Sequence, residues 1–488
     1  MMGRSKRRHA PSAIASAWRS LDAFAAWRPS LRKVQAHPLR AVGVGLLFVA
    51  LLWLVLTTSL PAALAPTSPD LALVLNARTP AALVTKAEGL RRELLALVDG
   101  PDGPARDATQ NGARAQGGAP RDLIAQLPEA DVRAGSSDAI AEQRRALRQA
   151  IGALARRVVA ADPLNATGYR LLAEVTDDPE RERRLMQAAV MRSRRETAAL
   201  FRLLNDSFLR KEHAATLDYA DVLLRTRIEL TNFVVAYLGA MAEDETGRPL
   251  LLARLAEAPK WRDAFFEALP RHVRMADTPL ALMVALKNEG QPVARLDSYL
   301  RFLVQKDLVD FAYNAWLRLL PAEQLQRIGF LTNPSFEDDP SGVPFDWQIA
   351  RGRNALLEFA RLRELGGQRA LHIVFGNGRV AFPVLSQVLV LPPGRYRLAG
   401  TLRGSIIGER GLRWRVACLS PGKVLAETEM LLGQSQRWRE FSLDIEVPES
   451  PGCRGQELRL FHDARSPSEE LVSGEVWFDD LKLRRVAG

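Results

Sequence analysis

The sequence contains little cysteine and little histidine. Two of its 488 residues are cysteine and six are histidine. Two cysteines exclude a small scaffold that is held together by many disulfides. The histidines beyond residue 70 are scattered without the spacing of metal ligands, and they are His213, His272, His372 and His462.

Common catalytic and nucleotide-binding motifs are also missing. The sequence has no GxxxxGKS/T, no HExxH, no GxSxG and no GxGxxG after a predicted strand. These absences exclude a P-loop, a HExxH zinc site and a nucleophile elbow. We predict that the protein is not an enzyme. Because the spacing of paired carboxylates cannot be read from a sequence, a glycan-processing enzyme remains an alternative.

Positive charge is concentrated at the N-terminus. The chain has 67 Lys and Arg against 56 Asp and Glu, a formal net charge of +11. Residues 1–40 hold nine of the basic residues and one acidic residue, so they carry +8 and leave +3 for the rest. A nearly balanced remainder lacks the basic surface of a nucleic-acid-binding protein, and we predict no nucleic-acid partner. The apolar share of 47% is ample for several hydrophobic cores.

Charged residues are absent between residues 41 and 69. The segment Ala41–Leu60 is mostly apolar, and as a helix it would be about 30 Å long, one hydrocarbon thickness. We predict a single transmembrane helix at residues 41–60. A cleaved signal peptide is the alternative, since Ala63-Leu64-Ala65 has the small-x-small form. Its basic region would then be unusually long, and Pro66 would follow the cut.

The charge asymmetry around this segment predicts its orientation. The excess of positive charge lies before it and Asp70 is the first charge after it, so residues 1–40 are predicted to be a basic cytoplasmic tail. The chain beyond residue 66 is then extracytoplasmic. The composition, rich in Arg and Ala, is typical of a GC-rich bacterium. We therefore predict a single-pass protein of a bacterial inner membrane with its C-terminal domains in the periplasm.

Residues 61–137 are predicted to be a helical stem followed by a flexible linker. Apolar residues recur near every 3.6 positions from Asp70 to Val98. Residues 99–137 are rich in Gly, Pro, Ala and Asp, and they cannot bury enough apolar surface to become ordered.

Residues 138–324 are predicted to form an α-helical repeat domain. Aromatic residues recur at intervals of 32 residues, each in the first helix of a predicted pair: Tyr169, Phe201, Phe233 and Phe265. The second helices are predicted near Arg181–Arg192, Glu212–Thr226, Pro249–Glu257 and Pro279–Lys287, with a fifth pair at Val293–Val304 and Leu308–Leu320.

The first of these units begins with Asp162-Pro163-Leu164-Asn165, followed by Tyr169 and Ala173. This pattern and the two-helix length resemble the tetratricopeptide repeat, although the tryptophan and glycine of its first helix are absent. The resemblance implies a solenoid that binds a protein partner. The alternative is an irregular helical bundle in which the spacing is partly accidental.

Residues 325–488 change to a two-residue period with short apolar runs between Gly and Pro turns. This predicts an antiparallel β-sandwich, and a length of about 160 residues favours a jelly roll over an immunoglobulin-like domain. The predicted strands are Arg369–Phe375, Ser386–Leu391, Arg395–Arg403, Leu412–Leu419, Arg437–Val447, Glu457–Phe461 and Gly474–Leu483.

Four motifs follow one another in this part of the chain. They are Asn333-Pro334-Ser335-Phe336-Glu337 with Gly342 and Trp347, Gln387-Val388-Leu389-Val390 with Pro393-Gly394-Arg395-Tyr396, Trp438-Arg439-Glu440-Phe441, and Val476-Trp477-Phe478-Asp479-Asp480-Leu481. Their order resembles that in carbohydrate-binding modules with the galactose-binding-like fold. The resemblance implies a jelly roll that holds a glycan on a concave sheet face or at its loop tips.

The same resemblance implies a structural calcium ion between the first and last strands. Glu337, Asp479 and Asp480 occupy the positions where members of the family place oxygen ligands, and such ligands suit calcium. The alternative is that Glu337 accepts hydrogen bonds from turn amides and that the aspartates end the last strand. No other cofactor is predicted.

Cys418 and Cys453 both lie in this predicted extracytoplasmic part. An isolated pair in an oxidising compartment is predicted to form a disulfide, because no neighbouring residues complete a metal-binding or catalytic pattern. Closing this loop would stabilise the fold by about 3–4 kcal/mol.

Alternation along two predicted strands indicates a glycan-binding surface. Arg397 and Arg403 share one face of the first strand, and Arg413 and Arg415 share one face of the second. If these strands are neighbours, their outer face is lined with guanidinium groups, which match the carboxylates of an acidic polysaccharide. The alternative is a solvated face paired with acids from neighbouring strands. The aromatic residues expected to stack on sugars are Trp347, Trp438 and Phe382, whereas Trp414 and Trp477 are expected in core or strand packing.

These features together predict a membrane-anchored periplasmic scaffold and glycan-binding protein. Its terminal sandwich would bind a glycan and its helices a protein partner, as an accessory to the synthesis or export of a surface polysaccharide or exopolysaccharide. The alternatives are an envelope protein–protein adaptor without sugar binding and a glycan-processing enzyme.

Overall fold

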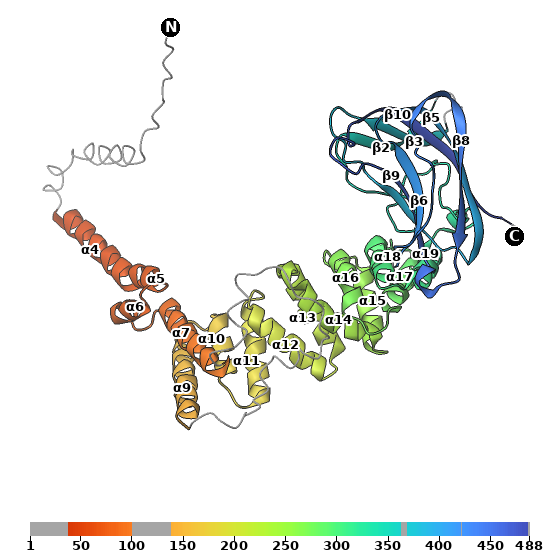
Figure 1. Ribbon diagram of the computed structural model, residues 1–488. Coiled ribbons are helices and arrows are strands. Elements are labelled where there is room, and N and C mark those ends of the chain that lie inside the picture. The colour runs from red at the N-terminus through yellow and green to blue at the C-terminus, as the bar shows by residue number, and fades with distance from the viewer. Residues whose placement is uncertain (1–37, 100–137, 363–367, 421, 487–488) are drawn as a thin grey trace, which may run out of the picture. The chain divides into compact units, whose positions relative to one another are not determined.

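The computed structural model describes residues 38–99, 138–362, 368–420 and 422–486. Helices occupy the described chain up to residue 325 and strands occupy the remainder (Figure 1). The chain forms two compact units, and of the described residues 38–99 and 138–203 belong to the first and those from 204 onward to the second. The predicted cytoplasmic tail and linker lie outside the described residues, apart from residues 38–40 and 99.

The N-terminal apolar segment is one continuous helix. It consists of α4 (Pro38–Leu54), the π-helical turn η1 (Val55–Ser59) and α5 (Leu60–Leu64). The window from Gly43 to Leu64 has a mean hydropathy of 2.2, so by length and composition the helix can cross a membrane. It continues beyond its predicted end at Leu60 because the π-helical turn changes the hydrogen-bond pattern where Pro61 would otherwise clash.

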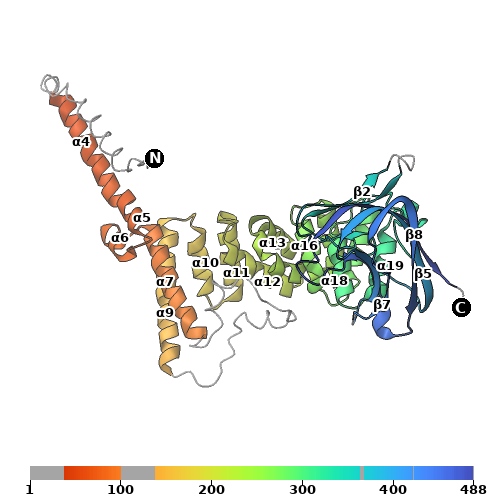
Figure 2. The same cartoon turned by 45° about the horizontal axis from the view of Figure 1, so that its top comes forward.

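Two helices pack against the end of the apolar helix. α6 (Pro69–Leu75) turns back beside α5, and α7 (Pro80–Asp99) begins after a short turn (Figures 1 and 2). Ala65, Ala72 and Ala82 are fully buried where the three helices meet. Small side chains at this point allow the helix backbones to approach closely.

The predicted stem helix pairs with the helix that follows the linker. α9 (Asp138–Ala161) lies against α7, and their shared core includes Leu83, Ile151 and Val158. Leu171 of the next helix, α10 (Ala166–Glu174), closes this core. α7 is therefore part of a helical bundle rather than an isolated stem. The domain boundaries predicted at residues 137 and 324 stay predictions.

Five helical pairs follow, as predicted. Each second helix lies within a few residues of its predicted position. The pairs are α10 with α11 (Pro179–Arg192), α12 (Thr197–Leu209) with α13 (His213–Thr226), α14 (Thr231–Glu243) with α15 (Gly247–Ala256), α16 (Arg262–Ala268) with α17 (Thr278–Asn288), and α18 (Leu296–Gln305) with α19 (Val309–Leu319).

The interval of 32 residues does not mark one repeated core position. Phe265 is fully buried, whereas Phe233 is 47% exposed. Tyr169 instead lies against the guanidinium of Arg192, 3.8 Å from its ring centroid. The aromatic residues thus all lie in the first helix of a pair but differ in burial and contacts. The tetratricopeptide assignment stays a prediction.

A buried arginine joins three segments of the first unit. Arg170 on α10 is 4% exposed, and its guanidinium contacts the carboxylates of Glu174 at 2.5 Å, Glu196 at 2.7 Å and Glu88 on α7. Burial opposes its charge, but Glu174, Glu88 and Glu196 more than offset burial and hold the pKa of Arg170 above its ordinary value. The packing of α7 on α10 therefore depends on this charge.

Replacing Arg170 with Ala is expected to lower the free energy of unfolding of the first unit by about 3–5 kcal/mol, because partly buried carboxylates would lose their cation. Hydrogen exchange of the α10 amides during urea titration measures the loss. Arg202→Ala is the control, since Arg202 pairs with Glu182 at 2.7 Å but is about half exposed. Its expected effect is below about 1 kcal/mol, and equal effects of the two substitutions would contradict the account.

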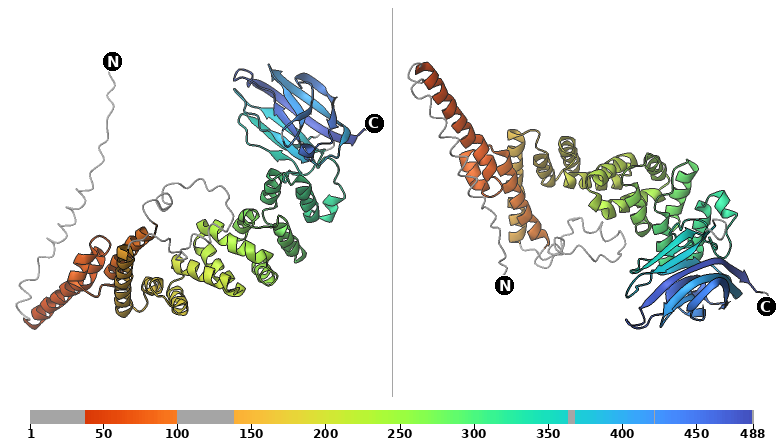
Figure 3. Two further views of the ribbon diagram at one scale, coloured as in Figure 1. Left: turned by 60° about the horizontal axis from the view of Figure 1, so that its bottom comes forward. Right: turned by 90° about the horizontal axis from the view of Figure 1, so that it is seen from above.

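The C-terminal part is a sandwich of two five-stranded antiparallel sheets, seen from two sides in Figure 3. Their strand orders are β1-β4-β9-β6-β7 and β2-β3-β10-β5-β8. The seven predicted strands are all present, while β1, β2 and β7 were not predicted. The bounds are β1 Gln348–Ile349, β2 Ala355–Arg361, β3 Arg369–Phe375, β4 Leu385–Leu389, β5 Gly394–Gly408, β6 Leu412–Cys418, β7 Val424–Glu427, β8 Gly433–Val447, β9 Gln456–His462 and β10 Val472–Arg485.

The predicted arginine-lined sheet face does not exist. β5 pairs with β10 and β8, whereas β6 pairs with β7 and β9, so the two arginine-bearing strands belong to different sheets. The prediction assumed that strands adjacent in the sequence are hydrogen-bonded neighbours. Here the chain crosses from one sheet to the other between Gly408 and Leu412.

Helix α19 packs against the beginning of the sandwich. Tyr313 and Trp316 contact the ring of Phe345 with centroid distances of 5.2 and 5.5 Å. Val309 fills the space where a β-carbon of Gly455 would lie. The last helices and the sandwich thus share one apolar contact within the second unit.

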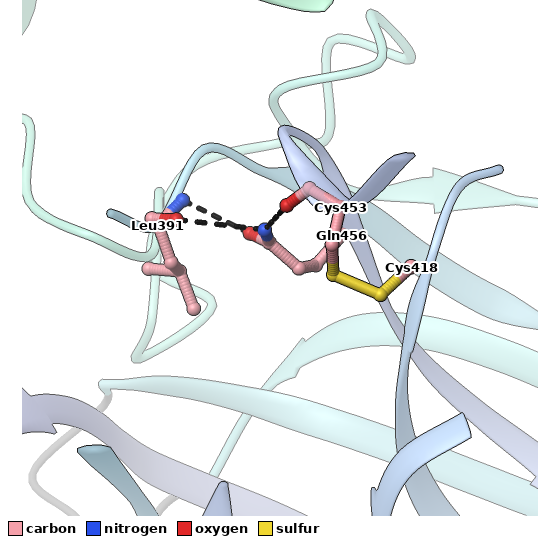
Figure 4. The surroundings of a disulfide bond; sticks show 4 residues. All are labelled: Leu391, Cys418, Cys453 and Gln456. Atoms are coloured by element: carbon pink, nitrogen blue, oxygen red, sulfur yellow. Dashed lines mark hydrogen bonds between the residues drawn. A yellow bond between two sulfur atoms is a disulfide. The ribbon is translucent and has the colours of Figure 1, made fainter. Parts of the chain in front are cut away.

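The predicted disulfide between Cys418 and Cys453 is confirmed (Figure 4). It joins the end of β6 to the turn before β9, and both cysteines are buried. Gln456 lies fully buried beside it and donates from Nε2 to the Cys453 carbonyl oxygen at 2.5 Å. Its Oε1 accepts from the Leu391 N–H at 2.9 Å. The disulfide and Gln456 together tie three segments of the sandwich at one end.

Candidate functional site

A line of five side chains crosses the outer face of the sheet β2-β3-β10-β5-β8. The strand register pairs Glu358 of β2 with His372 of β3, and His372 with Trp477 of β10. Trp477 is paired in turn with Arg403 of β5, whose guanidinium carbon lies 5.7 Å from the ring centroid of Trp438 on β8. We call these five residues the cross-sheet row. Every strand of this sheet contributes one member.

The two-residue period of β10 determines which side chains reach this face. Val476 and Phe478 are buried in the sandwich core, with no more than 1% of their surface exposed. Glu475 and Trp477 alternate with them and must therefore project to the opposite face. β3 follows the same rule, because Leu371 and Ile373 are fully buried on either side of His372.

The imidazole of His372 lies flat against the indole of Trp477. Their centroids are 3.8 Å apart and their planes differ by 13°. His372 Nδ1 contacts the Glu358 carboxylate at 3.1 Å and Nε2 contacts Glu475 at 2.8 Å. Trp477 Nε1 donates to the same Glu475 carboxylate at 3.2 Å. Four side chains from three strands are thereby held in one orientation.

Trp438 of β8 completes the row at its far end. Leu402 is paired with Arg439 and Gly404 with Ser435, so residues 436–438 lie opposite Arg403 alone. Trp438 lies three residues before the core residue Phe441, so the alternation of β8 places its side chain on the outer face. Trp438 is partly exposed beside the Arg403 guanidinium, which has a favourable charge–quadrupole interaction with an indole face.

This arrangement combines apolar ring surface with groups that form directional hydrogen bonds. Two partly exposed indoles lie on either side of Arg403 in the row, and Glu358 and Glu475 carry carboxylates about half exposed to solvent. Carboxylates accept hydrogen bonds, and a guanidinium donates them in a fixed fork. The surface is therefore suited to a ligand with apolar faces and a hydroxyl-bearing rim.

Arg397, Arg413 and Arg415 are engaged in ion pairs. Arg403 alone belongs to the row. The pairs are Arg397 with Asp444 at 2.6 Å, Arg413 with Asp463 at 3.0 Å, and Arg415 with Glu427 at 2.5 Å. These three arginines therefore fit the alternative given above, a solvated face paired with acidic residues. Arg413 and Arg415 also lie on the other sheet.

The prediction that Trp347 stacks on a sugar is wrong. Trp347 is fully buried, lies parallel to Phe336 with a centroid distance of 5.4 Å, and donates from Nε1 to the Asn333 carbonyl oxygen at 2.9 Å. Phe382 packs on the core beside Phe375. The prediction that Trp414 is a core residue is confirmed.

The calcium prediction names Glu337, Asp479 and Asp480, and it stays a prediction. Burial, together with the negative charges of Asp480 and Glu337, raises the pKa of Asp479. Both Glu337 oxygens accept from the Arg369 N–H at 3.2 Å, and Asp480 pairs with Lys482. Within the described ranges, no group of three or more His, Cys, Asp or Glu side chains is positioned to hold a metal ion.

Sequence reasoning missed most of the cross-sheet row. The sequence pattern does not indicate Glu358, it shows His372 only as a scattered histidine, and it predicts core or strand packing for Trp477. The alternation in Gly474–Leu483 was a usable signal, because Val476 and Phe478 occupy the apolar face and leave Trp477 on the other. No local signal indicates that β3 lies next to β10, since about a hundred residues separate them.

Comparisons with known proteins give matches only among solved structures. No family model and no curated protein matches the sequence. A candidate sugar-binding protein from Bacteroides thetaiotaomicron is 10% identical with a TM-score of 0.25, and the match covers 33% of this chain and 100% of that one. At these values the matches carry no argument about what this chain binds.

Two carbohydrate-binding modules are similar to the same extent. A family 61 module in complex with beta-1,4-galactotriose is 19% identical with a TM-score of 0.23, and the match covers 33% of this chain and 99% of that one. A family 4 module is 12% identical with a TM-score of 0.24, over 32% of this chain and 99% of that one.

The raised pKa of Asp479 predicts a pH dependence of stability. Folding disfavours its charged form, so the wild type should lose stability relative to Asp479→Asn as pH rises from the ordinary aspartate pKa to the raised pKa of the folded protein, and the difference should level off above it. Urea unfolding of both proteins in EDTA between pH 3 and 8 measures the difference. Asp444→Asn is the opposite control, because a hydrogen bond from Arg397 lowers the pKa of Asp444. A difference of the same sign for both variants would contradict the assignment.

Proposed function

We propose that the protein is a membrane-anchored glycan-binding protein and that the cross-sheet row is its binding surface. The observation that carries the proposal is the alignment of Trp477, Arg403 and Trp438 beside two carboxylates on one exposed sheet face. A sugar ring has apolar C–H faces and a rim of hydroxyls, so it is recognised by flat apolar surface and by hydrogen-bonding groups together.

The charges of the surface favour a neutral glycan over a strongly acidic one. Glu358 and Glu475 place negative charge at one end of the row, whereas Arg403 contributes one guanidinium. The carboxylates accept hydrogen bonds from sugar hydroxyls but repel the carboxylates of uronic acids. An acidic polysaccharide is therefore the less favoured ligand class and is included in the test below.

The proposed location is the periplasmic side of a bacterial inner membrane. The apolar helix supports an anchor, and the disulfide supports an oxidising compartment for the sandwich. The cytoplasmic position of the N-terminus is inferred from the charge asymmetry of the sequence. We assign the protein an accessory role in the synthesis or export of a surface polysaccharide or exopolysaccharide, since a tethered glycan-binding domain holds a polymer near the membrane.

The helical pairs are proposed to bind a protein partner as a tetratricopeptide-like scaffold. Within the second unit, Ile228 and Phe233 expose about half of their apolar surface in adjoining elements. An envelope adaptor that lacks sugar binding is the second candidate, and these exposed side chains are the observation that favours it. We propose that the protein is not an enzyme. A glycan-processing enzyme is kept as the third candidate for the test below.

A calcium ion between Glu337 and Asp479 is part of the proposal. Calcium binds carbonyl as well as carboxylate oxygens, so these two side chains supply part of its usual set of ligands. A bound cation would neutralise the negative charge that raises the pKa of Asp479. It would stabilise the contact between the segment before β1 and the end of the sandwich.

Replacing Trp438 or Trp477 with Ala is expected to weaken glycan binding at least about tenfold, because the stacking surface is lost. Affinity electrophoresis of the full-length protein in detergent, with neutral and uronic-acid polysaccharides in the gels, measures retention. Trp438→Phe should retain most of the binding, since a phenyl ring preserves the flat apolar surface.

Arg413→Ala is the matched control on the other sheet and should leave retention unchanged. Equal loss with Arg413→Ala would move the site away from the cross-sheet row. Absence of retention by any polysaccharide would favour the adaptor, and release of shortened glycans during incubation would favour the enzyme.

Calcium is expected to raise the melting temperature of the sandwich in proportion to its saturation, because it binds the folded state alone. Differential scanning calorimetry with calcium and with EDTA measures the shift. Asp479→Asn should abolish the shift, while Asp444→Asn should preserve it. An identical melting temperature of the wild type with and without calcium would contradict this part of the proposal.

A further inference from the structure

The helix α6 exposes an apolar face directly after the membrane-spanning segment. Val74 is 83% exposed and Leu71 60%, and Leu75 is exposed beside them. Ala72 on the opposite side of α6 is fully buried against α5 and α7. An exposed apolar face of this kind needs an apolar partner.

α6 runs back along the helix that precedes it (Figure 2). At its start the Ser68 N–H donates to the Leu64 carbonyl oxygen at 2.8 Å. Just after its end, Nδ2 of Asn76 donates to the Thr57 carbonyl oxygen at 2.6 Å. Because a helix rises 1.5 Å per residue, the C-terminal end of α6 lies about 10 Å further toward the middle of the apolar helix than its start.

The side chain of Asn76 donates a hydrogen bond to a carbonyl oxygen of the π-helical turn that precedes Pro61. Pro61 has no N–H, so it donates to no carbonyl of the preceding turn. An open carbonyl is costly where water is scarce, and the Asn76 amide supplies a donor to the Thr57 carbonyl. Hydrogen bonding thus fixes the end of α6 at the level of Thr57.

The side chains around Thr57 place the membrane surface at this level. Trp53, one turn earlier, is exposed, and tryptophan is enriched at membrane–water interfaces. The charge-free stretch from Ala41 to Thr57 falls within the length that spans a hydrocarbon core. Thr58 and Ser59 then interrupt the apolar run.

Two exposed arginines lie at the same level as the end of α6. Arg78 belongs to the turn between α6 and α7, and Arg157 of α9 donates from Nη2 to the Ala77 carbonyl oxygen at 2.8 Å. Asp70 lies at the other end of α6 and pairs with Lys86 at 2.7 Å. Cations next to exposed apolar side chains are the pattern of segments that bind at anionic membrane surfaces.

We propose that residues 69–79 form an interfacial segment that contacts the lipid bilayer. Val74 and Leu75 enter the boundary between headgroups and acyl chains in the leaflet that the C-terminal end of the apolar helix reaches. Arg78 and Arg157 bind the phosphates of anionic phospholipids in that leaflet. The inference rests on the membrane anchor of the proposed function, and it adds a second lipid contact that orients the first helical unit against the membrane.

Spin labels on the full-length protein in vesicles test this proposal. The chain's two cysteines form the buried disulfide, so a nitroxide can be attached to a single new thiol in Val74→Cys, Phe48→Cys or Met191→Cys. Accessibility to oxygen and to a water-soluble nickel complex reports depth. We expect the label at 74 to be protected from nickel at least threefold relative to 191 and to be shallower than the label at 48.

Changing the lipid composition tests the phosphate contacts of Arg78 and Arg157 separately from the insertion of Val74 and Leu75. Vesicles with 30% phosphatidylglycerol should increase the protection at residue 74 over phosphatidylcholine alone. The double variant Arg78→Ala and Arg157→Ala should remove that increase, and the corresponding Lys variants should keep it.

Each alternative gives a different result. Nickel access at residue 74 equal to that at 191, with 48 protected, would overturn the interfacial segment and leave the anchor intact. Nickel access at residue 48 would overturn the anchor itself. Spectral broadening at 74 that disappears on dilution with unlabelled protein would show that a second copy, and not lipid, covers α6.

Discussion

The two-residue period of β10 is the constraint on which the candidate site depends. Val476 and Phe478 are locked into the core between the sheets, so Glu475 and Trp477 cannot turn inward without a slip of the strand that would bury a carboxylate. β10 lies between β3 and β5, and its register therefore places His372 and Arg403 on either side of Trp477. The positions of the side chains proposed to bind a glycan therefore follow from core packing on the other face of the same strands.

One irregularity in β10 changes the alternation of its side chains after Asp479. The irregularity of β10 between Asp479 and Lys482 turns Leu481 into the core against Gly400. A β-carbon on Gly400 would lie 2.5 Å from the Leu481 side chain, so a larger residue would force the Leu481 and Phe441 side chains to shift. The same irregularity begins at Asp479, one of the two side chains proposed to bind a cation.

Features encoded by local patterns were predictable from the sequence. The apolar helix, the helical pairs, seven strands and the disulfide follow from periodicity, charge and turn residues. The sheet order was not predictable, because pairing of β3 with β10 joins residues far apart in the chain, and β5 and β6 separate into different sheets despite their proximity. For the same reason the prediction of an arginine-lined face is wrong. The burial of Trp347 is not readable from the local sequence, because it comes from contacts with other segments, among them Phe336 and Trp414.

Radical footprinting of the full-length protein with and without a neutral polysaccharide tests the central claim most directly. The glycan should reduce oxidation of Trp477 and Trp438 on one sheet while oxidation of Phe461, on the outer face of the other sheet, stays unchanged. Protection of Phe461 without protection of the two tryptophans would contradict the assignment of the cross-sheet row as the binding surface.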